Sequence, residues 1–232
     1  IISYYDYTNR ALKVIHCANV SCSAFDTPTI MDSEGDVGYH TSITIGIDGL
    51  PIISYNTNLP SYLKVVHCAN VSCSAFDTPT TVDSEGVSWS GISITIGIDG
   101  LPIISYHDYT NRALNVVHCA NVSCSAFTST TVDSEGDVGR YASITIGIDG
   151  LPIISYFDET NTALKVVHCA NVSCSAFDMP NTVYSEGGMW SNTSITIGID
   201  GLPIISYRDD SNDSLKVVHC ANPYCIPYWT RR

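Results

Sequence analysis

The chain has few charged residues for its length, and positive charge is scarcest. Of 232 residues, 14% are charged, with 10 Lys and Arg against 23 Asp and Glu, which gives a net charge of −13. So acidic a surface repels phosphate backbones, and we expect no nucleic-acid partner. No apolar run approaches the roughly 18 residues of a membrane-spanning helix, and we expect no membrane insertion. Because 44% of the residues are hydrophobic, the chain is nevertheless suited to a folded core.

An initiator Met and a secretory signal are also absent, which suggests a mature or trimmed chain. What is abundant is paired cysteine: an even number, uniform spacing and no leftover thiol favour disulfides and an extracellular or cell-surface location. Each pair encloses four residues, so a disulfide would close the base of a short hairpin loop between the third and fourth strands of a unit. The five pairs are Cys17/Cys22, Cys68/Cys73, Cys119/Cys124, Cys169/Cys174 and Cys220/Cys225.

Zinc is the alternative for these cysteines, because each pair follows a histidine that could also bind metal. No fourth ligand has a fixed spacing, however, and structural zinc sites have four ligands. The sequence therefore predicts no metal and no cofactor. The histidines are expected to be structural, lying between sheets with a ring nitrogen bonded to backbone. They are His16, His67, His118, His168 and His219.

These histidines also mark a tandem repeat, since they recur at steps of 51, 51, 50 and 51 residues. We interpret the chain as one repeat domain, 1–232, with units at about 1–41, 42–92, 93–142, 143–193 and 194–232. The segment Ser-Ile-Thr-Ile-Gly-Ile alternates as a strand does, and the Asp-Gly that follows it is a strong hairpin signal. Leu-Pro-Ile-Ile-Ser-Tyr and Leu-Lys-Val-Val-His-Cys predict two further strands, and Thr-Thr-Val-Asp-Ser-Glu-Gly a weaker fourth.

Four short strands in about 50 residues are typical of a propeller blade, which neighbours cover on both sides. The predicted fold is all-β: a five-unit β-propeller of four-stranded antiparallel blades, in which the first blade is incomplete because unit one begins at its second strand. A β-solenoid is the alternative. The Ile-Asp-Gly-Leu-Pro-Ile-Ile-Ser-Tyr and Leu-Lys-Val-Val-His-Cys segments resemble repeats of large secreted bacterial proteins of uncharacterised role. That resemblance implies a propeller-like repeat and offers no catalytic residues; the unit count is also similar to that of five-bladed propeller lectins.

Two polar patterns, an acidic segment and an Asn-x-Ser/Thr sequon, recur along the chain, and each has both a structural and a functional interpretation. The acidic segments at Asp32, Asp83 and Asp133 are interpreted as solvated turns, although their oxygens could bind Ca²⁺. Asn-x-Ser/Thr sequons are usable for glycosylation if the loops are exposed and the host glycosylates. The candidate acceptors are Asn19, Asn70, Asn121, Asn171, Asn192 and Asn212.

The connections between strands differ in how much they vary. The Asp-Gly turn and the cysteine loop hardly change between units, whereas the other two connections vary and should emerge on the opposite face. Each link between units carries an aromatic residue that could stack on a sugar ring. These candidate ligand-binding residues are Tyr39, Trp89, Tyr141 and Trp190.

Nearly every polar residue recurs in four or five units, which is unlike a single asymmetric active site. The sequence therefore favours no enzyme but a non-enzymatic, extracellular structural or adhesive protein that forms part of a surface assembly or filament. A glycan-binding propeller lectin is the alternative. The missing first strand predicts self-assembly by strand addition from another chain.

Overall fold

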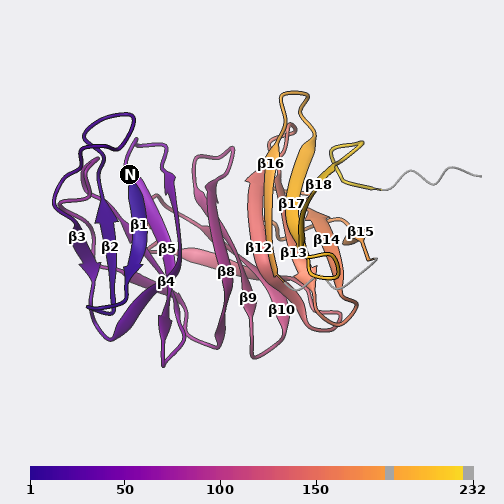
Figure 1. Cartoon of the computed structure of the whole chain (residues 1–232), viewed down its shortest axis with the longest axis horizontal. Coiled ribbons are helices and arrows are strands. Elements are labelled where there is room, and N and C mark those ends of the chain that lie inside the picture. The colour runs from indigo at the N-terminus through magenta and orange to yellow at the C-terminus, as the bar shows by residue number, and fades with distance from the viewer. Residues whose placement is uncertain (186–190, 227–232) are drawn as a thin grey trace, which may run out of the picture.

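The computed structural model describes residues 1–185 and 191–226 of the chain, and there it contains 18 strands in five antiparallel sheets (Figure 1). The first sheet has three strands: β1 (Ile2–Asp6), β2 (Ala11–Ile15) and β3 (Thr29–Asp32). The second has four: β4 (Asp36–Ile45), β5 (Pro51–Asn58), β6 (Leu63–His67) and β7 (Thr80–Asp83). The third has β8 (Val87–Ile96), β9 (Pro102–Asp108), β10 (Ala113–Cys119) and β11 (Phe127–Asp133).

The last two sheets repeat this order. The fourth consists of β12 (Val138–Ile146), β13 (Pro152–Asp158), β14 (Ala163–His168) and β15 (Asn181–Tyr184). The fifth consists of β16 (Ser191–Ile197), β17 (Pro203–Asp209) and β18 (Ser214–His219). All pairing within the sheets is antiparallel and between strands that follow one another in the chain, which excludes the parallel β-solenoid. The incomplete first sheet is as predicted.

The Asp-Gly segments form the predicted hairpin turns. In the second sheet the Gly46 amide donates to the Leu50 carbonyl at 2.8 Å, and the Leu50 amide donates to the Asp48 carboxylate at 3.0 Å. Gly49 has a φ of 78°, in the left-handed region that a side chain disfavours. The aspartate and the glycine therefore each have a defined part in the turn, which explains why both recur.

The first strand of each four-stranded sheet is longer than the sequence predicts. We interpreted Asp36 to His40 as a link between units, but β4 begins at Asp36 and continues through Ile45. The pairing of β4 with β5 shifts register on both sides of Tyr39, and His40 has a φ of 46°. A bulge of this kind bends a strand and redirects its side chains. The irregular residues that we interpreted as a loop are thus the bulged first half of β4, the first strand of the second sheet.

Adjacent sheets pack face to face through one recurring apolar interface. Leu12 and Val14 of the first sheet contact Ile53, Tyr55 and Val66 of the second, all at most 1% exposed. We call the face that packs on the following sheet the leading face and the one that packs on the preceding sheet the trailing face. The same pattern recurs between the second and third, third and fourth, and fourth and fifth sheets. Burial on both faces explains why these strands are apolar on both sides, as predicted.

The disulfides belong to these interfaces. Cys68 and Cys73 are fully buried on the trailing face of the second sheet, against Leu12 and Val14, so the bridge also supplies apolar packing. Such bonds form in oxidising compartments, in keeping with the expected location outside the cytosol. The prediction of paired cysteines is confirmed, and no described cysteine is free. The bonded pairs are Cys17–Cys22, Cys68–Cys73, Cys119–Cys124, Cys169–Cys174 and Cys220–Cys225.

The position of the second cysteine in each pair corrects the prediction in one respect. We expected the two cysteines to face each other across the base of a hairpin loop, but the antiparallel partner of Cys68 is Phe76. The second cysteine lies inside the loop, where the Cys73 amide donates to the Asn70 carbonyl at 3.0 Å. A left-handed backbone there turns the chain back toward the first cysteine. The second cysteines, with φ between 51° and 54°, are Cys22, Cys73, Cys124, Cys174 and Cys225.

Hydrogen bonds between Asp32 of one sheet and Tyr55 and Lys64 of the next also cross the inter-sheet interface, and we call them the polar tie. They correct our interpretation of the acidic segments as solvated turns. Asp32 is 7% exposed, so it is not a solvated turn residue. Its Oδ2 accepts hydrogen bonds from the Tyr55 hydroxyl at 2.6 Å and the Lys64 ammonium at 2.8 Å, both on the next sheet. Burial opposes ionisation, yet the bonds from Lys64 and Tyr55 keep the pKa of Asp32 below its usual range. Tyr156 and Lys165 hold Asp133 in the same way.

The sheets follow one another in an arc, as the blades of a propeller do. The innermost strands pack in series, β4 on β8, β8 on β12 and β12 on β16. The first sheet and the last lie at opposite ends of the arc (Figure 1), and in the described part of the chain their strands do not pack together as neighbouring sheets do. The propeller is therefore open between these two sheets. The described residues include no helix that could span a membrane.

Candidate functional site

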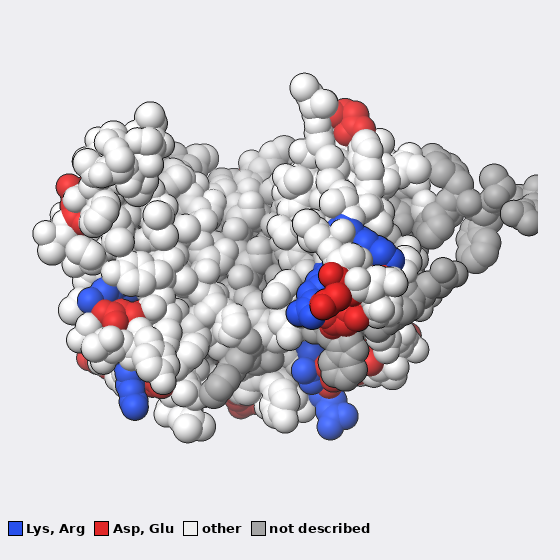
Figure 2. All heavy atoms as spheres, in the orientation of Figure 1, with Lys and Arg blue, Asp and Glu red and all other residues white. Residues whose placement is uncertain are grey.

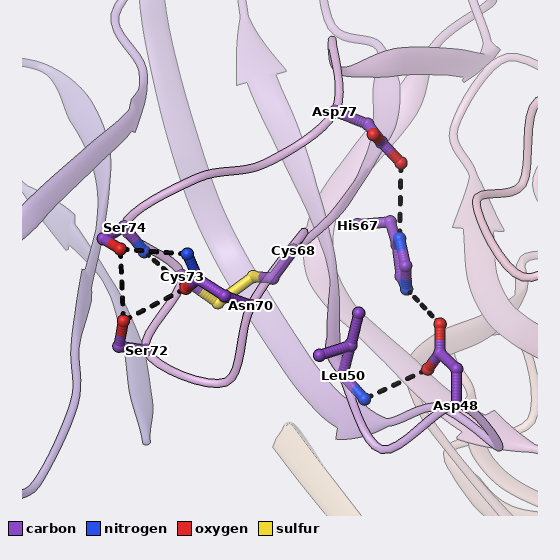
Figure 3. The surroundings of a disulfide bond; sticks show 9 residues. All are labelled: Asp48, Leu50, His67, Cys68, Asn70, Ser72, Cys73, Ser74 and Asp77. Carbon is purple, nitrogen blue, oxygen red and sulfur yellow. Dashed lines mark hydrogen bonds and ion pairs between the residues drawn. A yellow bond between two sulfur atoms is a disulfide. The ribbon is translucent and has the colours of Figure 1, made fainter.

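The end of the sheets that carries the Asp-Gly turns and the cysteine loops hardly changes in sequence between units, and Figure 3 shows it in the second sheet. His67 lies between two carboxylates, with Nε2 2.9 Å from Asp48 and Nδ1 3.3 Å from Asp77. His168 has the equivalent contacts with Asp149 and Asp178. The prediction of structural histidines holds in outline, but their ring partners are carboxylates and not the backbone. His67 and His168 thereby link the Asp-Gly turn to the segment that follows the cysteine loop, whereas His118 and His219 pair with the turn aspartate and His16 with Asp26.

Four of the six sequon asparagines, Asn19, Asn70, Asn121 and Asn171, lie on the cysteine loops at this same end. The Asn70 Oδ1 accepts from the Ser74 amide at 3.1 Å and the Ser72 hydroxyl at 3.0 Å, and its Nδ2 donates to the Ser74 hydroxyl at 3.0 Å (Figure 3). Asn222, which is followed by Pro223 and is not a sequon, accepts from two loop amides in the same manner. These hydrogen bonds explain why an asparagine recurs at this position even where the sequon is lost. Glycosylation of the six sequons stays a prediction.

The opposite, variable end carries a pocket of about 870 Å³. It lies where the β1–β2, β3–β4 and β5–β6 connections meet, so both of its sheets contribute. On the face drawn in Figure 2 most of the protein surface is uncharged, and the acidic and basic side chains form small separate groups, only some of which contain both signs. The pocket lining is likewise mainly polar and aromatic: Tyr5, Tyr7, Thr8, Arg10, Gly35, Asp36, Tyr39, Asn58 and Leu59. Its size is that of typical small-ligand sites.

Asp36 is the centre of this pocket, which we call the tyrosine pocket. Its Oδ1 accepts from the Tyr5 hydroxyl at 2.7 Å and its Oδ2 from the Asn58 amide at 3.1 Å, while the Tyr39 hydroxyl oxygen, which donates its one proton to Tyr5, lies 3.2 Å from Oδ2. The Tyr5 hydrogen bond, with smaller contributions from Asn58, Tyr39 and the charge of Arg10, lowers the pKa of Asp36. Asp36 is therefore ionised at neutral pH.

The two tyrosines form a stacked pair beside this carboxylate. The rings of Tyr5 and Tyr39 are 4.1 Å apart with planes at 27°, and the Tyr39 hydroxyl donates to the Tyr5 hydroxyl at 2.8 Å. Hydrogen bonding to Tyr39 and the nearby negative charge raise the pKa of Tyr5, so its proton is retained. The pocket thus combines an anionic acceptor, phenolic donors and aromatic ring surface.

The equivalent place between the third and fourth sheets has different chemistry. His107, Asp137, Arg140 and Glu159 take the repeat positions of Tyr5, Asp36, Tyr39 and Asn58. Arg140 contacts Asp137 at 3.0 Å and Glu159 at 2.7 Å, so these charges satisfy one another. His107 is buried, with Nε2 3.2 Å from Asp137. This cluster is held by ion pairs and differs in its chemistry from the tyrosine pocket.

The four aromatic residues predicted to bind a ligand have separate positions. Tyr39 lines the tyrosine pocket. Tyr141, on β12, packs against the apolar cluster between the fourth and fifth sheets, and β8 lies between its strand and that of Tyr39. Trp89 lies on β8, but its side chain is outside the description, and Trp190 lies outside the described residues. Sequence reasoning missed Tyr5, Asp36 and Asn58. Asp36 and Asn58 are partners in the β4–β5 pairing of the second sheet, and the packing of the first sheet on the second brings Tyr5 to them.

Comparisons with known proteins identify the fold and leave the family open. No protein-family model and no curated protein sequence matches the chain. A protein of unknown function from Dyadobacter fermentans is similar in structure, with a TM-score of 0.66 at 8% identity over 90% of this chain and 67% of that one. A polysaccharide lyase, an ulvan lyase of family PL25, has a TM-score of 0.59 at 11% identity, with 96% and 66% covered.

An exo-β-1,3-galactanase from Clostridium thermocellum is also similar, with a TM-score of 0.59 at 9% identity over 97% of this chain and 57% of that one. The chain thus spans about two thirds or less of the lengths of these three structures. Such likenesses support the propeller-type fold. Several of the similar structures are enzymes that process carbohydrates, among them the lyase, the galactanase, a β-xylosidase and two α-L-arabinofuranosidases. This finding overturns our expectation of a non-enzymatic structural, adhesive or filament-forming protein or of a lectin.

Proposed function

We propose that the protein is a carbohydrate-active enzyme that binds its saccharide in the tyrosine pocket. The observation that carries the proposal is the ionised Asp36, held by Tyr5, Tyr39 and Asn58 in a pocket of about 870 Å³. The pocket lies on the variable face, where repeat positions differ from unit to unit. The fold that this chain shares with glycosidases and a lyase is consistent with the proposal.

The lining suits a sugar ring in two ways. Tyr7 is 84% exposed at the rim, and with Tyr39 it offers ring faces on which the C–H face of a sugar can stack. Asp36 and Asn58 provide an acceptor and an amide for sugar hydroxyls, and Arg10 adds a cation to the lining. In this role Asp36 is a binding residue that fixes the orientation of the saccharide.

The proposal is tested with a panel of plant and algal oligosaccharides and polysaccharides. Calorimetry measures binding, while new reducing ends and ultraviolet absorbance of unsaturated sugars report cleavage. We expect Asp36→Asn to raise Kd for the best ligand by about 10- to 100-fold, because a hydrogen bond to a charged group contributes roughly 1.5–3 kcal/mol.

Asp137→Asn is the matched control, since Asp137 takes the same repeat position in the ion-paired cluster. It should leave saccharide affinity unchanged. If no saccharide binds, or if both variants weaken binding equally, the tyrosine pocket is not the site. Binding without any product would retain the site and refute the enzymatic half of the proposal.

A further inference from the structure

The last sheet exposes a face that is buried in every other sheet. On β18, Leu215 is 77% and Val217 61% exposed. The four leucines at the repeat position of Leu215 are fully buried, and the four valines at that of Val217 are at most 1% exposed. These buried counterparts are Leu12, Leu63, Leu114 and Leu164, and Val14, Val65, Val116 and Val166. The leading face of the last sheet is therefore an unpaired copy of an interface surface.

The first sheet exposes the complementary face. Ile2 of β1 is 48% exposed, whereas its counterparts Ile53, Ile104, Ile154 and Ile205 are fully buried. The Cys17–Cys22 disulfide is half-buried, whereas Cys68 and Cys73 are fully buried. The trailing face of the first sheet is thus the surface that a leading face covers elsewhere in the chain.

These two exposed faces match because the chain already contains their interface four times. In each internal copy a leucine and a valine of the leading face pack on an isoleucine, a valine and the disulfide of the trailing face, as Leu12 and Val14 do on Ile53, Val66 and Cys68. The two end faces belong to sheets at opposite ends of the arc (Figure 1). Exposed apolar patches of this kind commonly mark protein interfaces.

We propose that the leading face of the last sheet packs against the trailing face of the first sheet in a second copy of this chain. The contact is heterologous, since it joins two different surfaces of the same protein. It is a packing of sheet faces and needs no exchange of strands. The polar tie is missing from it, because the described part of the last sheet lacks the fourth strand that would carry the aspartate. We therefore expect reversible association.

Sedimentation velocity of the whole oxidised chain over a concentration series tests the proposal. The weight-average mass should rise with concentration, and Val217→Asp should raise the dissociation constant at least tenfold. Val71→Asp is the matched control, because Val71 is also 61% exposed but lies on the cysteine loop of the second sheet. Both residues are at the surface, so the thermal midpoints of the two variants should remain close to that of the parent chain.

Mixing two variants tests the heterologous geometry. Val217→Asp retains a working trailing face and Ile2→Asp a working leading face, so each alone should be monomeric and an equimolar mixture should form a dimer of one copy of each. A wild-type chain that stays monomeric over the series overturns the proposal. So does an Ile2→Asp variant that associates as the parent does, since this would indicate that two last sheets pair with each other.

Discussion

Burial of His107 should make the stability of the protein depend on pH between about 7 and 4. The ring is fully buried on β9, with Nδ1 3.5 Å from the Ser90 hydroxyl and Nε2 3.2 Å from Asp137. Burial lowers the pKa of His107 to about 4, an effect that outweighs the opposing charge of Asp137. In the unfolded chain its pKa returns to about 6.5. Between these values the unfolded chain binds a proton that the folded chain does not, so stability falls as the pH falls.

The magnitude follows from the difference between the two pKa values. About 2.5 units at roughly 1.36 kcal/mol per unit gives about 3 kcal/mol, lost progressively below about pH 6.5 and fully lost below about pH 4. His107→Asn removes this titration. Asparagine is suited to the position, because Asn56 takes it in the second sheet and is fully buried there. We expect the variant to gain about 3 kcal/mol relative to the parent between neutral pH and pH 4.

Urea unfolding of parent and variant at several pH values measures the effect. The difference between the two free energies of unfolding cancels carboxylates that titrate alike in both proteins. Burial opposes the ionisation of Asp137, but its bonds to Arg140 hold its pKa below the usual value, so it stays ionised through most of the range. A difference that is constant from pH 7 to pH 4 would refute the reasoning, since it would mean that His107 is protonated in the folded chain, paired with Asp137.

Three further predictions concern the scaffold. Tyr55→Phe removes one of the two side-chain donors to buried Asp32 and should lower the free energy of unfolding in urea by about 1–3 kcal/mol; an unchanged value would show that Lys64 alone satisfies the carboxylate. Replacing Cys68 and Cys73 together should lower the free energy of unfolding by about 2 kcal/mol or more, because the unfolded chain gains conformational freedom without the disulfide; a lower denaturant midpoint would show this. Asn70→Ala should lower the thermal midpoint even in protein from a host without glycosylation; an unchanged midpoint would contradict the loop-holding role.

Local patterns made much of the fold predictable. The alternation of Ser-Ile-Thr-Ile-Gly-Ile, the Asp-Gly turn and the cysteine spacing each act within a few residues, so the sequence states them directly. The bulged half of the innermost strand escaped prediction because its residues do not alternate. Gly38 and His40 have positive φ angles there, and the residues around them lack the alternation of a regular strand, so the sequence predicted a loop.

The polar contacts could not be predicted because their partners are far apart in the chain. Asp32 meets Tyr55 and Lys64 at separations of 23 and 32 residues. A signal was present in the repeat itself: where Tyr184 replaces the aspartate, Lys216 donates to the tyrosine hydroxyl at 3.0 Å instead. The tyrosine pocket had no comparable signal, since Tyr5 and Asp36 belong to different sheets and a tyrosine and an aspartate recur together at these positions in no other pair of sheets.

The position that follows Ile-Ile-Ser-Tyr shows how identical units can acquire different sites. It holds Tyr5, Asn56, His107, Phe157 and Arg208 in the five sheets. The preceding residues of this strand form the inter-sheet core, which is the same in each unit, and this position adds to it differently. Phe157 joins the apolar cluster between the fourth and fifth sheets, whereas Tyr5 lines the tyrosine pocket. Between the third and fourth sheets the result is an ion-paired cluster around Arg140. Between the first and second it is a pocket with Asp36 at its centre, and a repeat scaffold therefore presents one distinctive site there without losing its regular core.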